Sequence, residues 1–229
     1  MEPVGDRLPG VEVRWADLSG MAPDWTMLTG EERCRADRFR RPADADLFAH
    51  RRNLTRAVVA DILGVPPRSV WFDRSCPRCG DPSHGRPVLR RPGAEVGISV
   101  SSSSGVVAVA LGPTRRIGID IERVGTEPGE DDRGSDAPTV DASTWTQKEA
   151  VLKAFGVGLR VDPRTVVVAA GTTRRLLRLP PDLGLPGDVQ LSSVDLRPDV
   201  VGHVAVVGQH CPVVVRPVNR PPCCPPWPG

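Results

Sequence analysis

The chain has 229 residues, which is enough to bury a substantial core in one large or two small domains. Its 30 basic and 28 acidic side chains nearly cancel, and the net charge of +2 argues against binding to nucleic acid or to an anionic membrane. The first ten residues contain no apolar signal region, and apolar runs such as Val106–Leu111 are far too short to span a bilayer. We therefore expect a soluble cytoplasmic protein that binds neither nucleic acid nor a membrane.

The first long pattern in the chain is helical and covers residues 30–63. Thr29 and Glu32 form a capping box at its start. Pro42 interrupts the pattern, and a second run then carries apolar residues at helical spacing until Gly64 ends it. The sequence therefore predicts two consecutive helices.

A short strand, Ser69–Asp73, and a loop, Arg74–Arg91, are predicted after these helices. Cys76 and Cys79 form a C-x-x-C pair within the loop, and His84 follows closely. No second ligand pair completes a four-ligand zinc set. We therefore favour a reduced structural loop, while a weak metal-binding turn stays open as the alternative.

The middle of the chain contains three strand patterns. Two of them, Glu95–Val100 and Val106–Leu111, are joined by the small residues Ser101–Gly105, and the third, Arg116–Glu122, alternates cleanly. The following stretch, Gly125–Ser143, is acidic, rich in glycine and proline, and without periodicity, which is typical of a flexible loop.

The last third of the chain begins with a predicted helix, Thr146–Phe155, which ends at Gly156. The tail, Pro217–Gly229, is dominated by proline, and we expect it to be disordered. Three strands are predicted between helix and tail, at Thr165–Ala169, Asp188–Leu196 and His203–Gly208.

A faint internal repeat links the two parts of the chain. Glu95-Val-Gly-Ile-Ser99 precedes an apolar strand, and Asp188-Val-Gln-Leu-Ser192 precedes another. Such a repeat would suit two related α+β halves, so we place an N-terminal half at residues 1–112, a C-terminal half at 113–216 and a proline- and cysteine-rich tail at 217–229.

Only two of the 30 basic residues are lysines, Lys148 and Lys153, and both flank Glu149 on the predicted helix. An ammonium group is a compact point charge, whereas a guanidinium group is a flat fork. Lysines retained in a chain so rich in arginine indicate a site that needs point charges beside a carboxylate. The alternative is a solvated helix face, because Glu149 and Lys153 have the spacing of an ordinary ion pair.

Asp120 and Glu122 share one face of the strand that contains them, with Cα atoms about 6.5 Å apart. Two carboxylates this close repel each other unless a cation lies between them. With Glu149 they supply three oxygen ligands, which favours magnesium shared with a substrate phosphate, whereas zinc or iron would need nitrogen or sulfur ligands. The alternative is a solvated strand face.

These residues resemble the paired motif of the Sfp-type 4′-phosphopantetheinyl transferases. The two matching segments are Gly118-Ile-Asp-Ile-Glu122 and Trp145-Thr-Gln-Lys-Glu-Ala-Val-Leu-Lys-Ala-Phe-Gly-Val-Gly-Leu159. Supporting matches lie in order between about residues 30 and 170: Arg38-Phe39, Asp44, Arg56, Gly85-Arg86-Pro87 in place of the family's G-K-P, and Ser101-Ser-Ser103 in place of its S-H-S.

The resemblance implies an α+β fold, a pseudo-dimer of two similar α+β halves with the active site at their interface. It implies an enzyme that transfers the phosphopantetheine arm of coenzyme A to a serine of an acyl or peptidyl carrier protein. Asp120, Glu122 and Glu149 would bind Mg²⁺ as the metal ligands. Glu149 would take the proton of the carrier serine, directly or through a bound water, and Lys153 would neutralise charge as 3′,5′-ADP leaves.

The resemblance also implies partners and contact residues. We expect a monomer that binds coenzyme A and a carrier protein. The residues expected to bind coenzyme A are Arg38, Arg56, Arg86, Ser101, Ser102, Ser103 and Lys148.

Two departures from the family pattern keep other readings open. Ser102 replaces a histidine that contacts phosphate, and a neutral hydroxyl should bind phosphate more weakly. The loop after Glu122 is short and acidic, which should repel acidic carrier proteins; its acidic residues are Glu127, Glu130, Asp131, Asp132 and Asp136. The alternatives are a repurposed homologue with different chemistry on a carrier-bound or coenzyme A-bound substrate, and a non-catalytic assembly-line partner.

Overall fold

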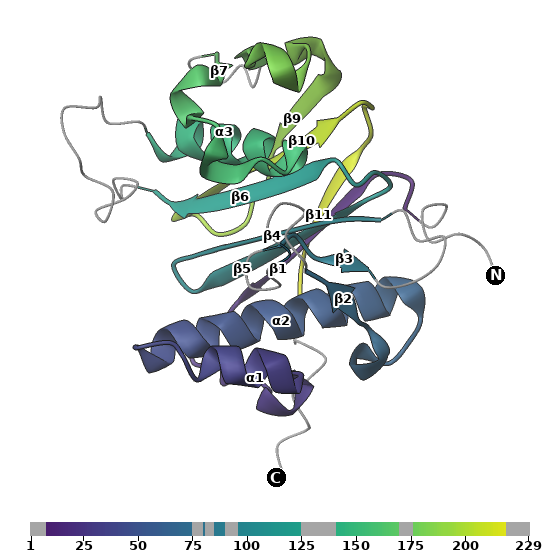
Figure 1. The fold of residues 1–229 in the computed structure, drawn as a ribbon, viewed down its shortest axis with the longest axis vertical. Coiled ribbons are helices and arrows are strands. Elements are labelled where there is room, and N and C mark those ends of the chain that lie inside the picture. Colours follow the sequence, from purple (N-terminus) through teal and green to yellow (C-terminus); the bar gives the residue numbers. More distant parts are fainter. Residues whose placement is uncertain are drawn as a thin grey trace.

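The structure is a computed structural model that describes residues 8–74, 80, 85–89, 96–124, 141–169 and 176–218. Within these residues it has a mixed α+β fold, as predicted, with helices α1 (Gly30–Ala36), α2 (Pro42–Leu63) and α3 (Ala142–Phe155) (Figure 1). No helix in the described part of the chain is both long and apolar enough to cross a membrane.

Two larger sheets form the centre of the fold (Figure 1). The first has the order β11-β1-β5-β4 and the second the order β6-β10-β9. The strands of the first sheet are β1 (Val11–Asp17), β4 (Gly97–Ser103), β5 (Val106–Gly112) and β11 (Val213–Pro217). Those of the second are β6 (Ile117–Arg123), β9 (Val189–Ser193) and β10 (Val200–Val207). Two small ribbons pair β2 (Phe72–Asp73) with β3 (Val88–Leu89), and β7 (Val167–Val168) with β8 (Leu176–Arg178).

Strands β1, β4 and β5 repeat the order of β6, β9 and β10. In each set the first strand pairs antiparallel with the last strand, and the last strand pairs antiparallel with the strand before it. Helix α2 follows β1 along the chain, and α3 follows β6. The added strand β11 comes from the C-terminal part of the chain, yet it pairs in parallel with β1 in the first sheet.

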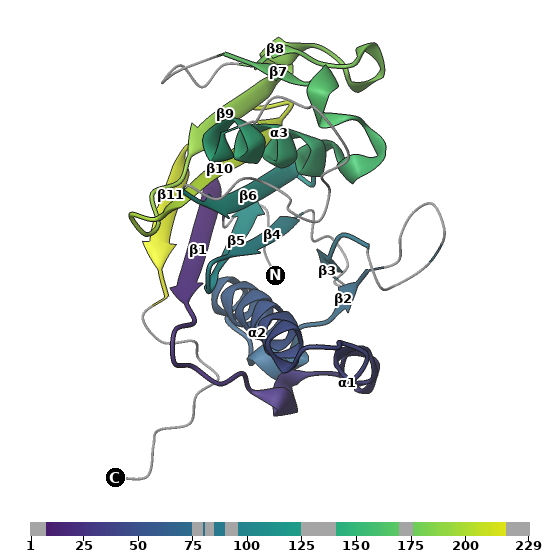
Figure 2. The ribbon, with the colours of Figure 1, turned by 90° about the vertical axis from the view of Figure 1, so that its left-hand side faces the viewer.

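The two sheets lie between the two long helices, so that α2 and α3 occupy opposite outer sides (Figures 1 and 2). Leu54 and Val58 of α2 pack with Ile98 of β4 in one core. A second core lies between the sheets and joins Val13 of β1 to the isoleucines of β6, which are all buried. The third core packs Val151 of α3, among others, against the second sheet. The face of β6 opposite the buried isoleucines is therefore directed toward α3.

The helix boundaries confirm most of the local predictions. Thr29 and Glu32 form the predicted capping box, and Gly64 and Gly156 end α2 and α3 in the left-handed conformation. Helix α3 begins four residues earlier than predicted, because the Asp141 side chain accepts a hydrogen bond from the Thr144 amide and caps it there.

The serine stretch between the two central strands was wrongly predicted as a connection. Strand β4 continues through Ser103, and only Ser104 and Gly105 form the turn. Both turn residues have positive φ, 51° and 75°, which matches the tight two-residue hairpins that follow the twist of the strands.

Several other strand predictions differ from the structure. Ser69 closes a 3-10 turn, so that β2 is shorter than predicted, and β3 lies within the predicted loop. Strands β1, β8 and β11 were not predicted. Pro217, placed in the tail by the sequence, ends β11, and the amide of the next residue, Val218, donates to the Trp15 carbonyl. The described residues do not include Cys76, Cys79, His84, residues 125–140 of the predicted acidic loop, or residues 219–229.

Candidate functional site

The site begins where α3 crosses β6 at Gly118. A Cβ atom on this glycine would lie 2.0 Å from the Ala150 carbonyl oxygen and 2.5 Å from the Ala154 amide nitrogen. Only a residue without a side chain allows α3 to come this close to the strand. The close contact brings Glu149 and Lys153, on the same helix, over the face of β6 that carries Asp120.

Asp120 is 4% exposed, and its two carboxylate oxygens have different surroundings. Oδ1 accepts a hydrogen bond from the Ser101 hydroxyl at 2.8 Å and forms an ion pair with Lys153 Nζ at 2.5 Å. Oδ2 is buried and has no hydrogen-bond partner among the described residues. A buried carboxylate oxygen without a partner is costly, so it fits an oxygen that ligates a cation.

Glu149 of α3 resembles Asp120 in its burial and in having one unpartnered carboxylate oxygen. It is buried, and Oε1 has no hydrogen-bond partner in the described part of the chain. Burial, together with the nearby Asp120 and Glu122 carboxylates, raises the pKa of Glu149, although the Lys153 ammonium opposes this shift.

Glu122 completes the acidic set but already has a partner. Its Oε2 accepts a hydrogen bond from the Ser103 hydroxyl at 3.0 Å. Burial raises the pKa of Glu122 and the Asp120 charge adds to this effect, whereas the Ser103 hydrogen bond opposes it. The Asp120 charge therefore destabilises the charged forms of Glu122 and Glu149, and a bound cation would offset this repulsion.

The carboxylates fit magnesium by their chemistry, because all of them are hard oxygen ligands and two of them have unpartnered buried oxygens. Within the described residues, however, no group of three or more histidine, cysteine, aspartate or glutamate side chains is gathered closely enough to hold a metal ion. Lys153 instead occupies one Asp120 oxygen, and Ser103 occupies one Glu122 oxygen.

A buried histidine, which was not predicted, lies beside the acidic residues. His203 on β10 is the cross-strand partner of Asp120, and its Nδ1 lies 2.8 Å from the Thr146 hydroxyl. Thr146 Oγ1 also lies 2.9 Å from the Ala142 carbonyl oxygen and 3.0 Å from that of Ser143. The contact between Thr146 and His203 joins the N-terminal part of α3 to the second sheet.

A cluster of arginines lies on the N-terminal side of the fold, around a single glutamate. Arg52 and Arg56 of α2 pair with Glu32 of α1, at 3.3 Å and 2.7 Å. Arg35 and Arg52 also lie over the ring of Phe48. Burial, followed by the charge of Arg52, lowers the pKa of Arg74 to about 8.

The arginine cluster has more positive charge and more donors than its partners satisfy. Arg56 is 4% exposed, and its Nη1 has no hydrogen-bond partner among the described residues. Arg51, which is exposed, belongs to the same group, because burial lowers the pKa of Arg52 and the charge of Arg51 adds to this effect. Arg35, Arg52 and Arg74 also have buried nitrogens without a hydrogen-bond partner among the described residues. Unpartnered guanidinium donors on several elements fit an anion with several oxygens, such as a phosphate.

The remaining predicted contact residues have separate positions. Arg86 donates to the backbone carbonyls of Arg115, Ile117 and Lys153, and burial lowers its pKa to about 10. Lys148 lies near Asp162, and burial lowers its pKa. Arg38 is exposed just after α1.

Ser102 lies on the face of β4 that it shares with Ile98 and Val100, which pack into the α2 core. It therefore points away from the carboxylates, to which Ser101 and Ser103 point.

Of the predicted residues, the structure brings together the three carboxylates, Lys153, Ser101 and Ser103, and it places Arg56 in the arginine cluster. Arg35, Arg51, Arg52 and Arg74 were not predicted. The i,i+4 spacing of Arg52 and Arg56 on the helix was the one signal that could have indicated part of this cluster.

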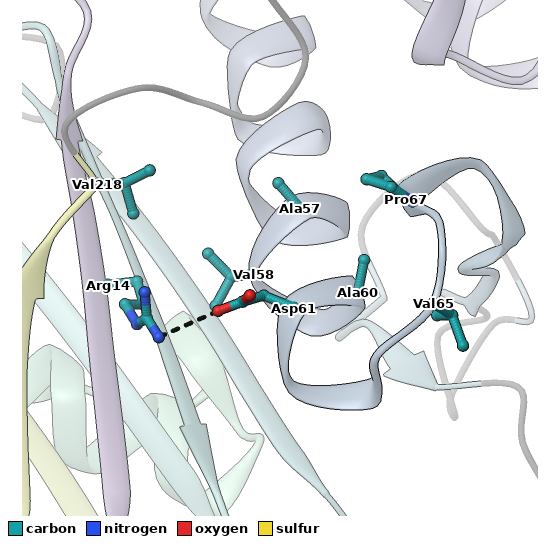
Figure 3. Close-up of a pocket in the computed structure, with 8 residues that line it drawn as sticks. All are labelled: Arg14, Ala57, Val58, Ala60, Asp61, Val65, Pro67 and Val218. Carbon is teal, nitrogen blue, oxygen red and sulfur yellow. Dashed lines mark hydrogen bonds and ion pairs between the residues drawn. The ribbon is translucent and has the colours of Figure 1, made fainter.

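A cavity of about 370 Å³ lies elsewhere, between α2 and β1 (Figure 3). It is lined mainly by apolar side chains, including Val58 and Val218, and the ion pair between Arg14 and Asp61 crosses its edge at 3.2 Å. None of the predicted site residues lines this cavity.

Two comparisons bear on these residues. The chain is 31% identical, over 151 residues, to the 4′-phosphopantetheinyl transferase HetI of Nostoc sp.. The match covers 58% of this chain and 61% of HetI, so the chain spans less than two thirds of that relative. No family model matches the chain.

Proposed function

We propose that this chain, whose similarity to HetI supports membership of the Sfp-type 4′-phosphopantetheinyl transferases, is a Mg²⁺-dependent enzyme of that kind. It would transfer the phosphopantetheine arm of coenzyme A to a serine of an acyl or peptidyl carrier protein. The observation that carries the proposal is the pair of buried, unpartnered oxygens, Asp120 Oδ2 and Glu149 Oε1, beside the Lys153 ammonium.

We also propose that the fold is a pseudo-dimer of two α+β halves. The shared order of β1-β5-β4 and β6-β10-β9 supports this proposal, as does the helix that follows the first strand of each half. The carboxylates lie on the first strand of the second half, and Ser101 and Ser103 reach them from the first half. The site would then lie at the interface of the halves.

In this proposal Asp120, Glu122 and Glu149 would hold Mg²⁺. When bound, the ion would supply positive charge that neutralises the pyrophosphate of coenzyme A. The structure suggests how the protein's own groups would take part. Glu149 is a candidate base for the carrier serine, because burial and neighbouring carboxylates raise its pKa and so increase its affinity for a proton.

The transfer requires one bond to form and one to break. The serine oxygen would attack the phosphorus that bears the pantetheine arm while its proton goes to Glu149. The bond from this phosphorus to the bridging oxygen would break, and 3′,5′-ADP would leave. Lys153 is suited to stabilise the charge of the leaving group, because its side chain is 30% exposed and its ammonium is already held at Asp120.

The arginine cluster would bind the phosphates of coenzyme A. Four guanidinium groups of the cluster have buried donors without a hydrogen-bond partner among the described residues, and a phosphate would satisfy them. This cluster would provide the positive charge that Ser102, in the place of a histidine, does not. Lys148 remains a proposed phosphate contact, whereas the donors of Arg86 are already engaged with carbonyls.

A carrier-loading assay tests the proposed function. The chain is incubated with coenzyme A, Mg²⁺ and unmodified carrier proteins, and the carrier mass is measured intact. A gain of one phosphopantetheine group that requires Mg²⁺ is expected. Binding of coenzyme A without any loading would favour the repurposed homologue, and absence of both would favour the non-catalytic partner. Arg56→Ala should weaken coenzyme A binding, with Arg178→Ala as the control, because Arg178 is exposed on β8 and lies outside the cluster.

A further inference from the structure

Strand β4 carries three serines at alternate positions, Ser99, Ser101 and Ser103, all on the face directed at β6. The Ser99 hydroxyl oxygen accepts a hydrogen bond from the Ile119 amide at 3.0 Å. Ser101 donates to Asp120 Oδ1 at 2.8 Å, and Ser103 donates to Glu122 Oε2 at 3.0 Å. Three hydroxyl groups in a row thus connect one strand to its neighbour.

These hydroxyl contacts take the place of a backbone ladder, because β4 and β6 belong to different sheets. Side chains of a strand return to the same face every two residues. Ser101 and Ser103 therefore have the same spacing as Asp120 and Glu122, and each serine meets one carboxylate. Ser99 uses the same geometry to satisfy a backbone amide and does not contact a carboxylate.

The hydrogen atoms at Ser101 can be assigned. A serine hydroxyl has one proton to donate, whereas the ammonium of Lys153 can donate but cannot accept a hydrogen bond. In the contact between Lys153 Nζ and Ser101 Oγ at 3.3 Å the lysine is therefore the donor. The Ser101 proton then goes to Asp120 Oδ1, which the ammonium also contacts. Oδ1 is occupied from two sides, and the orientation of the carboxylate leaves Oδ2 as the buried oxygen without a partner.

We propose that Ser101 and Ser103 are positioning residues that orient Asp120 and Glu122 for Mg²⁺, rather than contacts to the phosphates of coenzyme A. This inference rests on the proposed function, because it assumes that these carboxylates bind the metal ion. Ser102, on the opposite face of β4, shares its face with Ile98 and Val100, which pack into the α2 core. The alternation of the strand thus assigns Ser101 and Ser103, but not Ser102, to the carboxylates.

The test measures Mg²⁺ binding by calorimetry on the full chain saturated with coenzyme A, and coenzyme A binding separately in EDTA. Loss of a group that orients a metal ligand typically weakens metal binding about 10–100-fold. Ser101→Ala and Ser103→Ala should each weaken Mg²⁺ binding by about that factor and leave metal-free coenzyme A binding within about twofold. Ser101→Thr, which keeps a hydroxyl group, should restore Mg²⁺ binding.

Ser99→Ala is the matched structural control. It leaves the buried Ile119 amide without its acceptor, so it should lower the melting temperature through the same contact between strands. If Ser99→Ala weakens Mg²⁺ binding as much as Ser101→Ala, the serines merely hold the strands together and the positioning role is wrong. Weaker metal-free coenzyme A binding in Ser101→Ala and Ser103→Ala, with normal Mg²⁺ binding, would likewise overturn it. A wild-type chain that binds no Mg²⁺ would contradict the proposed function itself, and this inference with it.

Discussion

Gly118→Ala is the substitution that should most directly disturb the packing that builds the site. The added Cβ would lie 2.0 Å from the Ala150 carbonyl oxygen, whereas ordinary contact begins at 3.4 Å, so α3 would have to move by about 1.4 Å, the difference between these distances. The obstructing atoms belong to the helix backbone and cannot turn aside. Overpacking of this kind costs about 1–3 kcal/mol. For a chain of this size the melting temperature should fall by roughly 2–12 °C.

The same shift should also affect the site, because Glu149 moves with α3 while Asp120 stays on β6. Mg²⁺ binding should therefore weaken together with the melting temperature, as measured by calorimetry and thermal unfolding. Gly30→Ala is the control, since Gly30 begins α1 and no heavy atom lies within 4 Å of its Cβ position. That variant should keep the wild-type melting temperature or exceed it slightly. Wild-type stability and Mg²⁺ binding in Gly118→Ala would refute the argument that this glycine sets the distance between helix and strand.

Three further predictions concern the charged residues. Burial raises the pKa of Glu149, so the stability of the metal-free fold should fall as pH rises from the ordinary pKa of 4.5 through the raised pKa. Glu149→Gln should reduce this fall, as measured by thermal unfolding in EDTA. Arg86→Ala should lower the melting temperature, because three backbone carbonyls lose their donor. An unchanged melting temperature with weaker coenzyme A binding would instead make Arg86 a coenzyme contact. Lys153→Arg should sharply slow carrier loading, because a planar head replaces a point charge held 2.5 Å from Asp120 Oδ1; a wild-type rate would show that a lysine is not needed there.

The helices could be predicted because their signals are local. Thr29, Glu32 and Gly64 act within a few residues of the helix ends, where capping groups and left-handed glycines do their work. The face shared by Asp120 and Glu122 could likewise be predicted from the alternation of a strand.

The partners of those residues could not be predicted, because they depend on which strands meet in space. Nothing in the sequence near Asp120 indicates that Ser101 lies beside it, and a run of serines is also typical of a turn. Strand β11 pairs with β1 across almost the whole length of the chain, and such pairing leaves no local signal.

The arginine cluster was hidden for a different reason. Nearly all basic residues of the chain are arginines, so that four further arginines carry little information in the sequence. The cluster becomes visible only in the fold, where α2 and the residue after β2 bring their arginines close to Glu32 of α1.

The central claim is that Asp120 Oδ2 and Glu149 Oε1 are ligands of a cation that acts together with coenzyme A. Calorimetric titration of Mg²⁺ into the chain saturated with coenzyme A tests this claim directly, with Glu149→Gln as the variant, because glutamine keeps the shape of the side chain and loses its charge. We predict that the wild-type chain binds Mg²⁺ and that Glu149→Gln binds it at least about tenfold more weakly while keeping its fold. Equal Mg²⁺ binding by the two proteins would contradict the account.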